Sequence, residues 1–312
     1  MYSLIVPVYM NEGSIGELVQ ALEGMQAELD QPLEVVFVVD GSPDASYTEL
    51  KRRLPQAAFA SQLISHSRNF GSFAAIRTGF IAARGSYFAV MAADLQEPPE
   101  LAAQFFRQLA RDEHDVLIGT RDSRQDPWSS RLASRLFWGA YRRLINRSIP
   151  SGGVDVFACN REFRDQLIAL GESNSSLIGL LFWLGFRRGT VRYERQLRRH
   201  GKSAWTLRRK LKYMTDSVFS FSDLPIRILL LLGLFGTGMA VLIGLAVLLA
   251  RLTLGPVVPG YAATMTTVLL FGGLNALGLG IIGAYVWRAF ANTQNRPLAV
   301  VMKSEEFSGA TR

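Results

Sequence analysis

Two oxygen-bearing side chains, Asp94 and Gln96, closely follow an apolar run of strand length, Tyr87–Met91. A carboxylate at the end of a buried strand, in an open α/β sheet, lies where such sheets bind their ligands. Carboxylate and amide oxygens are hard ligands, and they suit a Mg²⁺ or Mn²⁺ ion that holds a diphosphate. The pattern therefore predicts a metal and diphosphate site. A second interpretation needs no ligand, because Glu97 and Glu100 would also favour the dipole of a helix that begins here.

Apolar runs and helix-length segments alternate through residues 1–121. Strands are expected at residues 2–9 and 33–39, in QLISH, in the Tyr87 run and in DVLIGTR, with helices at 14–29, 44–54, 72–83 and 98–110. This alternation predicts an α/β fold with a mostly parallel, doubly wound sheet, in which the carboxyl ends of the strands share one edge. The polar residues expected at that edge are Tyr9, Asn11, Glu12, Asp40, Ser42, Arg68, Asn69, Asp94, Gln96 and Arg121.

These polar residues fit a nucleotide, because carboxylates accept from base N–H groups and ribose hydroxyls while a metal ion and arginine neutralise a diphosphate. The GxGxxG fingerprint of dinucleotide-binding folds and the GxxxxGK[ST] P-loop are both absent from the sequence. A nucleotide-sugar site is the interpretation that remains. His66, His114 and His200 are isolated, and no Ser-His-Asp or metal-ligand spacing includes them, so no catalytic role is expected for them.

The last third of the chain is far more apolar than the rest and predicts two transmembrane helices. Ile228–Leu249 is a 22-residue run without charge, long enough to cross about 30 Å of hydrocarbon. Tyr261–Trp287 is a second uncharged run. Lysine and arginine flank the pair more than they occupy its connection, which predicts that both ends face the cytoplasm. Glycines in the second run leave two alternatives, a plain anchor or a contact in a homo-oligomer.

Cysteine content and the first residues predict that the polar part of the chain stays in the cytoplasm. The single Cys159 excludes an internal disulfide, and MYSLIVPVY lacks the charged start and cleavage site of a signal peptide. The expected division is a catalytic domain at 1–186, a basic juxtamembrane segment at 187–223, a transmembrane hairpin at 224–290 and a cytoplasmic tail at 291–312.

Two segments are strongly basic. Residues 121–147 hold seven arginines against two aspartates and have the pattern of an amphipathic helix from Trp128 onward. Residues 187–212 hold eleven Lys and Arg against Glu194 alone, a local charge of +10 in a chain of net charge +8. The second segment lies close to an apolar run, so anionic lipid heads and a lipid phosphate explain it better than nucleic acid does. For any single basic residue, a solvated charged face is the alternative.

Five ordered segments, VPVYMNE, VVDGSPD, SRNFGSFAAIRTGF, AADLQEPPEL and GTR, resemble family 2 glycosyltransferases of the polyprenyl-phosphate type. The similarity covers nearly the whole chain, including YVWRAFANTQNRP near its end. The resemblance implies a GT-A-like nucleotide-sugar domain followed by juxtamembrane amphipathic helices and the hairpin, in a bacterial-type inner (cytoplasmic) membrane. It also implies an inverting transfer from a UDP- or GDP-sugar to polyprenyl (undecaprenyl) phosphate at the cytoplasmic face.

The same resemblance implies roles for individual residues. The nucleotide would be bound by Pro7, Tyr9, Glu12, Asp40, Arg68 and Asn69. The metal would be held by Asp94 and Gln96, which with Arg121 would form the catalytic set. The acceptor phosphate would be bound by Arg131, Ser134, Arg198 and Lys202. No strong base is required, because a phosphomonoester with a second pKa near ~6 is largely dianionic already.

The sequence departs from the family pattern in three places. Val39 replaces the first of a common Asp pair, and Ala92 replaces the first carboxylate of a D-x-D motif, which weakens the expected Mg²⁺ or Mn²⁺ site. Asp155 is kept from a GDFRL segment whose arginine is lost, and an isolated Asp at a loop end also caps or turns the backbone. Ala92 leaves open a non-catalytic membrane scaffold, and the shared fold leaves open a lipid-linked saccharide acceptor. No residue encodes which sugar is moved.

Overall fold

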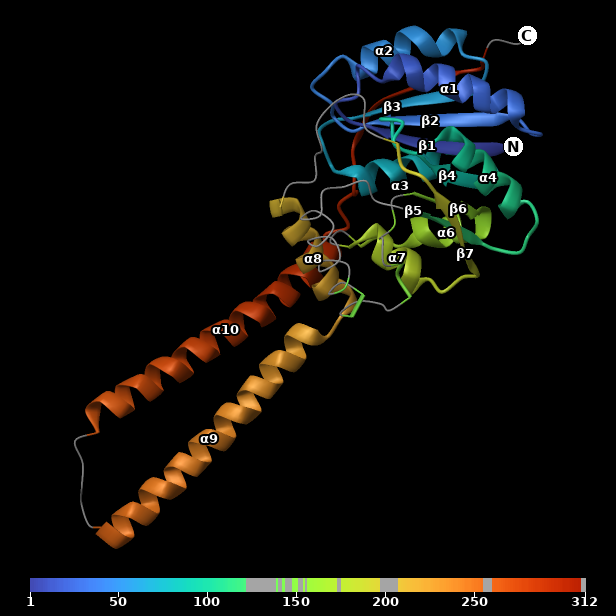
Figure 1. The fold of residues 1–312 in the computed structure, drawn as a ribbon. Coiled ribbons are helices and arrows are strands. Elements are labelled where there is room, and N and C mark those ends of the chain that lie inside the picture. Colours follow the sequence, from blue (N-terminus) through green and yellow to red (C-terminus); the bar gives the residue numbers. More distant parts are fainter. Residues whose placement is uncertain are drawn as a thin grey trace.

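The computed structural model describes residues 1–121, 156–172, 175–196, 207–254 and 260–309, together with Gly139, 142–143, 148–150 and Val154. Within this part of the chain, an α/β domain lies at one end and two long helices extend from it as a hairpin (Figure 1). The predicted architecture, a GT-A-like domain followed by two apolar helices, is confirmed.

The α/β domain is built on one sheet whose strand order is β7-β5-β6-β4-β1-β2-β3-β8. The predicted strands are β1 (Tyr2–Val8), β2 (Leu33–Val39), β3 (Ala60–His66), β4 (Tyr87–Val90) and β5 (Val116–Arg121). The first four pair in parallel. β6 (Phe157–Asn160) lies antiparallel between β4 and β5, and β7 (Arg188–Tyr193) is parallel to β5. The sheet is therefore mostly parallel, as expected, with two antiparallel strands, β6 and β8 (Val301–Phe307), that no sequence pattern predicted.

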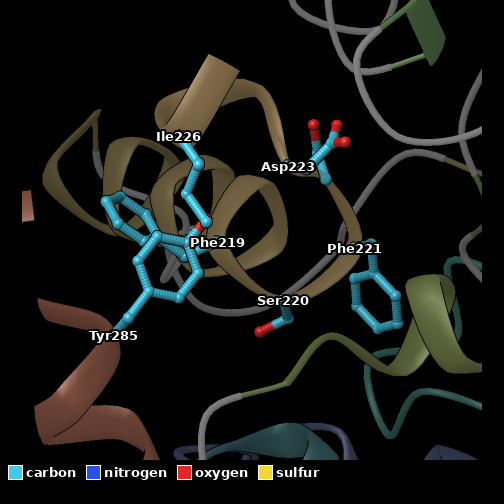
Figure 2. Close-up of a pocket in the computed structure, with 7 residues that line it drawn as sticks. Phe219, Ser220, Phe221, Asp223, Ile226 and Tyr285 are labelled. Atoms are coloured by element: carbon cyan, nitrogen blue, oxygen red, sulfur yellow. The ribbon is translucent and has the colours of Figure 1, made fainter. Parts of the chain in front are cut away.

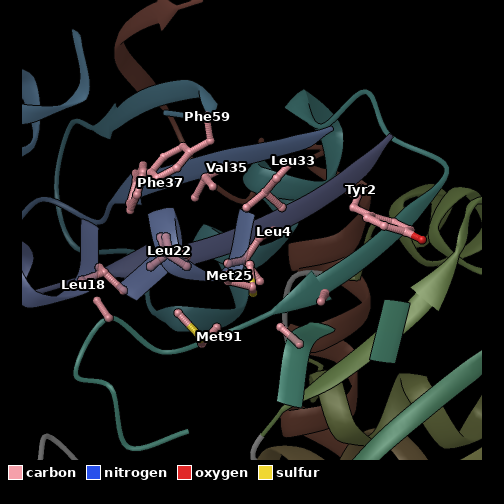
Figure 3. Packing of buried hydrophobic residues seen from close by; sticks show 14 of the residues in the cluster. Tyr2, Leu4, Leu18, Leu22, Met25, Leu33, Val35, Phe37, Phe59 and Met91 are labelled. Atoms are coloured by element: carbon pink, nitrogen blue, oxygen red, sulfur yellow. The ribbon is translucent and has the colours of Figure 1, made fainter. Parts of the chain in front are cut away.

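Helices cover both faces of the sheet because successive residues of a strand point to opposite sides. α1 (Ile15–Glu28), α2 (Ser46–Arg53) and α4 (Pro99–Leu109) bury one face, where Leu18 and Leu22 of α1 pack with Leu4 of β1 and Phe37 of β2 (Figure 3). A short 3₁₀ turn (Leu54–Gln56) follows α2. α3 (Ser72–Ala82), α6 (Arg161–Ala169) and α7 (Leu177–Trp183) cover the other face, where Ile5 is buried.

The apolar third forms α9 (Leu224–Leu254) and α10 (Tyr261–Thr293), preceded by α8 (Leu207–Phe221). Leu224–Val247 and Leu270–Thr293 are each long and apolar enough to cross a membrane, and almost none of their residues is buried. Arg288 of α10 forms a 2.7 Å ion pair with Asp216 of α8. This contact ties the end of the hairpin to the juxtamembrane helix.

The chain returns from α10 to the sheet through β8, which pairs antiparallel with the edge strand β3. The Glu305 carboxylate accepts from the Tyr47 hydroxyl at 2.6 Å and lies 2.8 Å from the Lys51 ammonium. Burial and this bond to Glu305 raise the pKa of Tyr47 to about 12. The segment at residues 291–312, expected to be a cytoplasmic tail, contributes the strand β8 to the α/β domain, and the start of α9 and the end of α10 both lie on the side of that domain (Figure 1).

Candidate functional site

The turn after β4, residues 93–97, presents the two predicted metal ligands; we call it the Asp94 turn. Asp94 Oδ1 accepts the backbone N–H of Gln96 at 3.2 Å. Leu95 between them has φ +54°, a left-handed conformation that costs an ordinary residue about 1–2 kcal/mol. The Ser14 hydroxyl donates to the Ala93 carbonyl at 2.9 Å, which attaches the turn to the start of α1. The backbone is thus held in place on both sides of the Asp94 carboxylate.

The loops after β1 and β2 are joined by reciprocal hydrogen bonds. The Glu12 N–H donates to Asp44 at 3.0 Å, and Glu12 Oε2 accepts the Ala45 N–H at 2.9 Å. The Ser42 hydroxyl donates to Asp44 at 2.6 Å and accepts the Met10 N–H at 2.8 Å. Sequence reasoning did not assign Asp44 a role, although it lies in the DGSPD segment. It joins two loops that carry predicted nucleotide ligands.

Electrostatics favour an ionised Asp44. Burial opposes the charge, but hydrogen bonds from the Ser42 and Ser46 hydroxyls and from the Glu12 and Ser46 backbone N–H groups outweigh it and lower the pKa of Asp44 below its ordinary value. The carboxylate therefore accepts all these bonds at neutral pH.

Asp40, predicted to bind the nucleotide, is buried and holds a neighbouring loop. Its carboxylate accepts the N–H groups of Phe70 and Gly71 at 2.8 and 2.7 Å. Its Oδ1 lies 2.9 Å from His66 Nδ1, and His66 Nε2 lies 2.9 Å from the Thr78 hydroxyl. Direct contact of Asp40 with a nucleotide stays a prediction. The structure adds that Asp40 and His66, to which no role was assigned, together fix residues 67–71.

Arg68 and Asn69 are exposed on that loop. The Arg68 guanidinium lies 4.0 Å from the centre of the Phe70 ring. Gly41, with φ +58°, allows the β2 loop to approach closely, because a Cβ there would lie 2.2 Å from the Arg68 carbonyl carbon. Pro7 and Tyr9 are half-buried at the end of β1. The predicted nucleotide ligands therefore come from the ends of three adjacent parallel strands.

Arg121 ends β5, where it pairs in register with Tyr193 of β7. The segment after β7 crosses to the Asp94 turn: the Gln196 N–H donates to the Gln96 carbonyl at 2.9 Å. The Arg195 guanidinium donates to Gln96 Oε1 at 2.5 Å, and its Nε lies 4.0 Å from Glu97. Sequence reasoning placed Arg195 in the basic segment but did not single it out. No local pattern indicated its contact with Gln96.

Several predicted residues lie outside the described part of the chain. These are the acceptor-phosphate candidates Arg131, Ser134, Arg198 and Lys202, and the loop candidate Asp155. Their roles remain predictions. The amphipathic helix expected from Trp128 onward falls largely in the same unassigned range.

The side-chain oxygens of Asp94 and Gln96 on the Asp94 turn are suitable ligands for a divalent cation of the Mg²⁺ type. The described residues contain no group of three or more His, Cys, Asp or Glu that could hold a metal by themselves. Mg²⁺ commonly takes one or two protein carboxylates beside waters and substrate phosphates, so Asp94 and Gln96 could supply the protein share. Such a site would form fully only with a diphosphate present.

A hollow of about 490 Å³ lies away from these loops, where α8, α9 and α10 meet (Figure 2). Aromatic rings form much of its wall, with the Phe219 and Tyr285 rings from α8 and α10 next to each other in Figure 2. The full lining is Phe219, Ser220, Phe221, Ser222, Asp223, Ile226 and Tyr285. The hollow lies at the boundary between the α/β domain and the hairpin.

Comparison with known proteins covers both parts of the chain. The model of glycosyl transferase family 2 matches residues 3–169. An uncharacterized glycosyltransferase of Synechocystis sp. is 30% identical, over 96% of this chain and 94% of its own. An undecaprenyl-phosphate 4-deoxy-4-formamido-L-arabinose transferase of Pseudomonas aeruginosa is 33% identical, over 95% and 88%. An SfII prophage-derived bactoprenol glucosyl transferase of Shigella flexneri is 27% identical, over 97% of each chain.

Proposed function

Because this chain belongs to glycosyl transferase family 2, we propose that it transfers a sugar from a UDP- or GDP-sugar to the phosphate of a polyprenyl carrier at a membrane. The observation that carries this proposal is the joining, in one chain, of the polar strand-end loops to two helices long enough to cross a membrane. Relatives named for undecaprenyl phosphate and bactoprenol align over both parts, which supports a lipid-phosphate acceptor.

The donor would lie across the loops after β1, β2 and β3. Pro7, Tyr9 and Glu12 would contact the base and ribose, with Asp40 supporting the 67–71 loop. Arg68 and Asn69 are exposed on that loop and would reach the nucleotide. Asp94 and Gln96 would hold a Mg²⁺ or Mn²⁺ ion, which supplies positive charge to the leaving diphosphate.

The protein's main tasks would be positioning and charge stabilisation, since the acceptor phosphate is already a strong enough nucleophile at neutral pH. Its oxygen would attack the anomeric carbon opposite the diphosphate, and this single displacement would invert the configuration. Arg121 at the end of β5, with Arg131, Ser134, Arg198 and Lys202, would bind the incoming phosphate.

The hairpin would place the α/β domain on the cytoplasmic face of a bacterial-type inner membrane, where the carrier phosphate is exposed. The hollow between α8, α9 and α10 would be the place from which the lipid enters. At several glycines of α10, including Gly272 and Gly280, an added Cβ atom would have no neighbour within 4 Å. They leave room for a homo-oligomeric helix contact.

A scaffold without catalysis is the second candidate, favoured by Ala92 in place of the expected carboxylate. The fold also allows a transferase with a different acceptor, in which the sugar is added to a lipid-linked saccharide instead of to polyprenyl phosphate. A panel assay distinguishes all three.

The test is incubation of membranes containing the full chain with radiolabelled UDP- and GDP-sugars and undecaprenyl phosphate, followed by extraction of the lipid product. We expect label in a lipid from which mild acid releases the sugar, because a glycosyl phosphate is acid-labile. Membranes with an Asp94→Ala chain serve as the control and should give less product by roughly a hundredfold or more. Absence of labelled lipid with every donor would reject the proposal, and label only with a saccharide-linked lipid would assign the other acceptor.

A further inference from the structure

Arg195 and Gln96 are the basis of this inference, which rests on the proposed metal-assisted donor site. Gln96 Oε1 accepts from the Arg195 guanidinium at 2.5 Å. The same segment is fixed a second time, because the Gln196 N–H donates to the Gln96 carbonyl at 2.9 Å. Glu97, which is only 4% exposed in its side chain, lies 4.0 Å from Arg195 Nε. The segment after β7 is therefore attached to the Asp94 turn at several points.

The hydrogen bond from Arg195 occupies Gln96 Oε1, the atom that would bind the metal ion. An amide oxygen that faces a guanidinium at hydrogen-bond distance presents its lone pairs to a fixed positive charge. A divalent cation on the same oxygen would be repelled by that charge at close range. Asp94 is the only carboxylate of the expected D-x-D pair that this chain keeps, so the site depends more strongly on Gln96. A metal ion bound at this turn would therefore compete with Arg195 for Gln96.

We propose that Arg195 is a positioning residue that latches the Asp94 turn before the donor binds and releases Gln96 when the nucleotide diphosphate and a divalent cation enter. The diphosphate makes the exchange favourable, because it brings negative charge to both cations at once.

Mn²⁺ binding to the full chain in neutral detergent, with and without UDP, tests the latch without any turnover. We expect Arg195→Gln, which keeps the length of the stem and removes the charge, to bind Mn²⁺ alone roughly tenfold more tightly than the natural chain. UDP should then strengthen Mn²⁺ binding by a smaller factor in the variant, because the competing contact is already gone. Arg192→Gln, an exposed position on β7, is the matched control and should behave as the natural chain.

The effect must also disappear when Gln96 is absent. In a Gln96→Ala background, Arg195→Gln should leave Mn²⁺ affinity unchanged, because a competitor has no effect once its shared ligand is removed. UDP binding without metal shows that each variant is folded. Equal or weaker Mn²⁺ affinity in Arg195→Gln would overturn the latch while leaving the proposed transferase intact. Failure of the natural chain to bind Mn²⁺ even with UDP would overturn the latch together with the metal in the proposed function.

Discussion

Asp94 is the residue on which the proposed donor chemistry depends most. Ala92 removes the other expected carboxylate, and the described residues offer no alternative cluster of metal ligands. We expect Asp94→Ala to lower Mn²⁺- or Mg²⁺-dependent turnover by roughly a hundredfold or more, the scale of losing one electrostatic group at a reacting centre. Ala92→Asp should keep turnover and raise metal affinity. Radiolabel transfer at graded metal concentrations measures both, and full activity of Asp94→Ala in chelator would exclude the metal role.

Asp44 gives the site a defined dependence on pH. Its folded pKa lies below the ordinary value, so its contribution to stability is present above that value and is lost as pH falls through the lowered pKa. We expect Asp44→Asn to destabilise the chain by about 1 kcal/mol at pH 7, where hydrogen bonds to the charged group are lost. The gap should narrow below about pH 4. Thermal unfolding from pH 7 to pH 3 measures this, with exposed Glu113→Gln as the control.

At the scale of single elements, β8 holds the chain that follows α10 against the α/β domain. It follows α10 and pairs with β3, so the hairpin must begin and end on the side of the α/β domain. Cysteines introduced at Thr253 in α9 and at exposed Ser304 in β8 should therefore react with impermeant reagents from opposite sides of the membrane. Labelling of both from one side would remove the two-span hairpin.

The natural cysteine should not disturb that experiment. Cys159 lies in β6 with no exposed surface, and burial raises the pKa of its thiol well above the ordinary range. A neutral, inaccessible thiol reacts slowly with such reagents. The unmodified chain, in which Cys159 is the only cysteine, is thus a direct control for background labelling.

For the whole molecule, the basic segment at residues 187–212 precedes the two apolar helices in the sequence. If Arg198 and Lys202 bind the acceptor phosphate, alanine at either position should raise the apparent KM for polyprenyl phosphate or lower kcat, with nucleotide affinity nearly unchanged. If they are only lipid-surface charges, each contributes about 1 kcal/mol to attachment. Turnover in neutral detergent with a short-chain acceptor separates these cases, since unimpaired single variants there would argue against the acceptor role.

The sequence by itself determined the elements and the chemistry at their ends. Apolar runs of strand length, each followed by polar residues such as Asp40 and Asp94, were enough to predict five strands and the edge where they converge. Two uncharged runs predicted α9 and α10. These features can be predicted because strand and helix periods, and the length needed to cross a bilayer, are local properties of the chain.

Only the tertiary structure decided which side chains meet. His66 and Asp40 are separated by 26 residues, Arg195 and Gln96 by 99, and Tyr47 and Glu305 by 258. Each pair joins segments that are far apart in the sequence, and no local pattern in either segment indicates the other. β8 could not be predicted from the sequence either. Its residues are mostly exposed, and its sequence, VMKSEEF, has four polar residues in the middle. Contacts of this kind depend on long-range packing, so hydrophobic periodicity predicted the first five strands but neither β6 and β8 nor the pairing of β3 with β8.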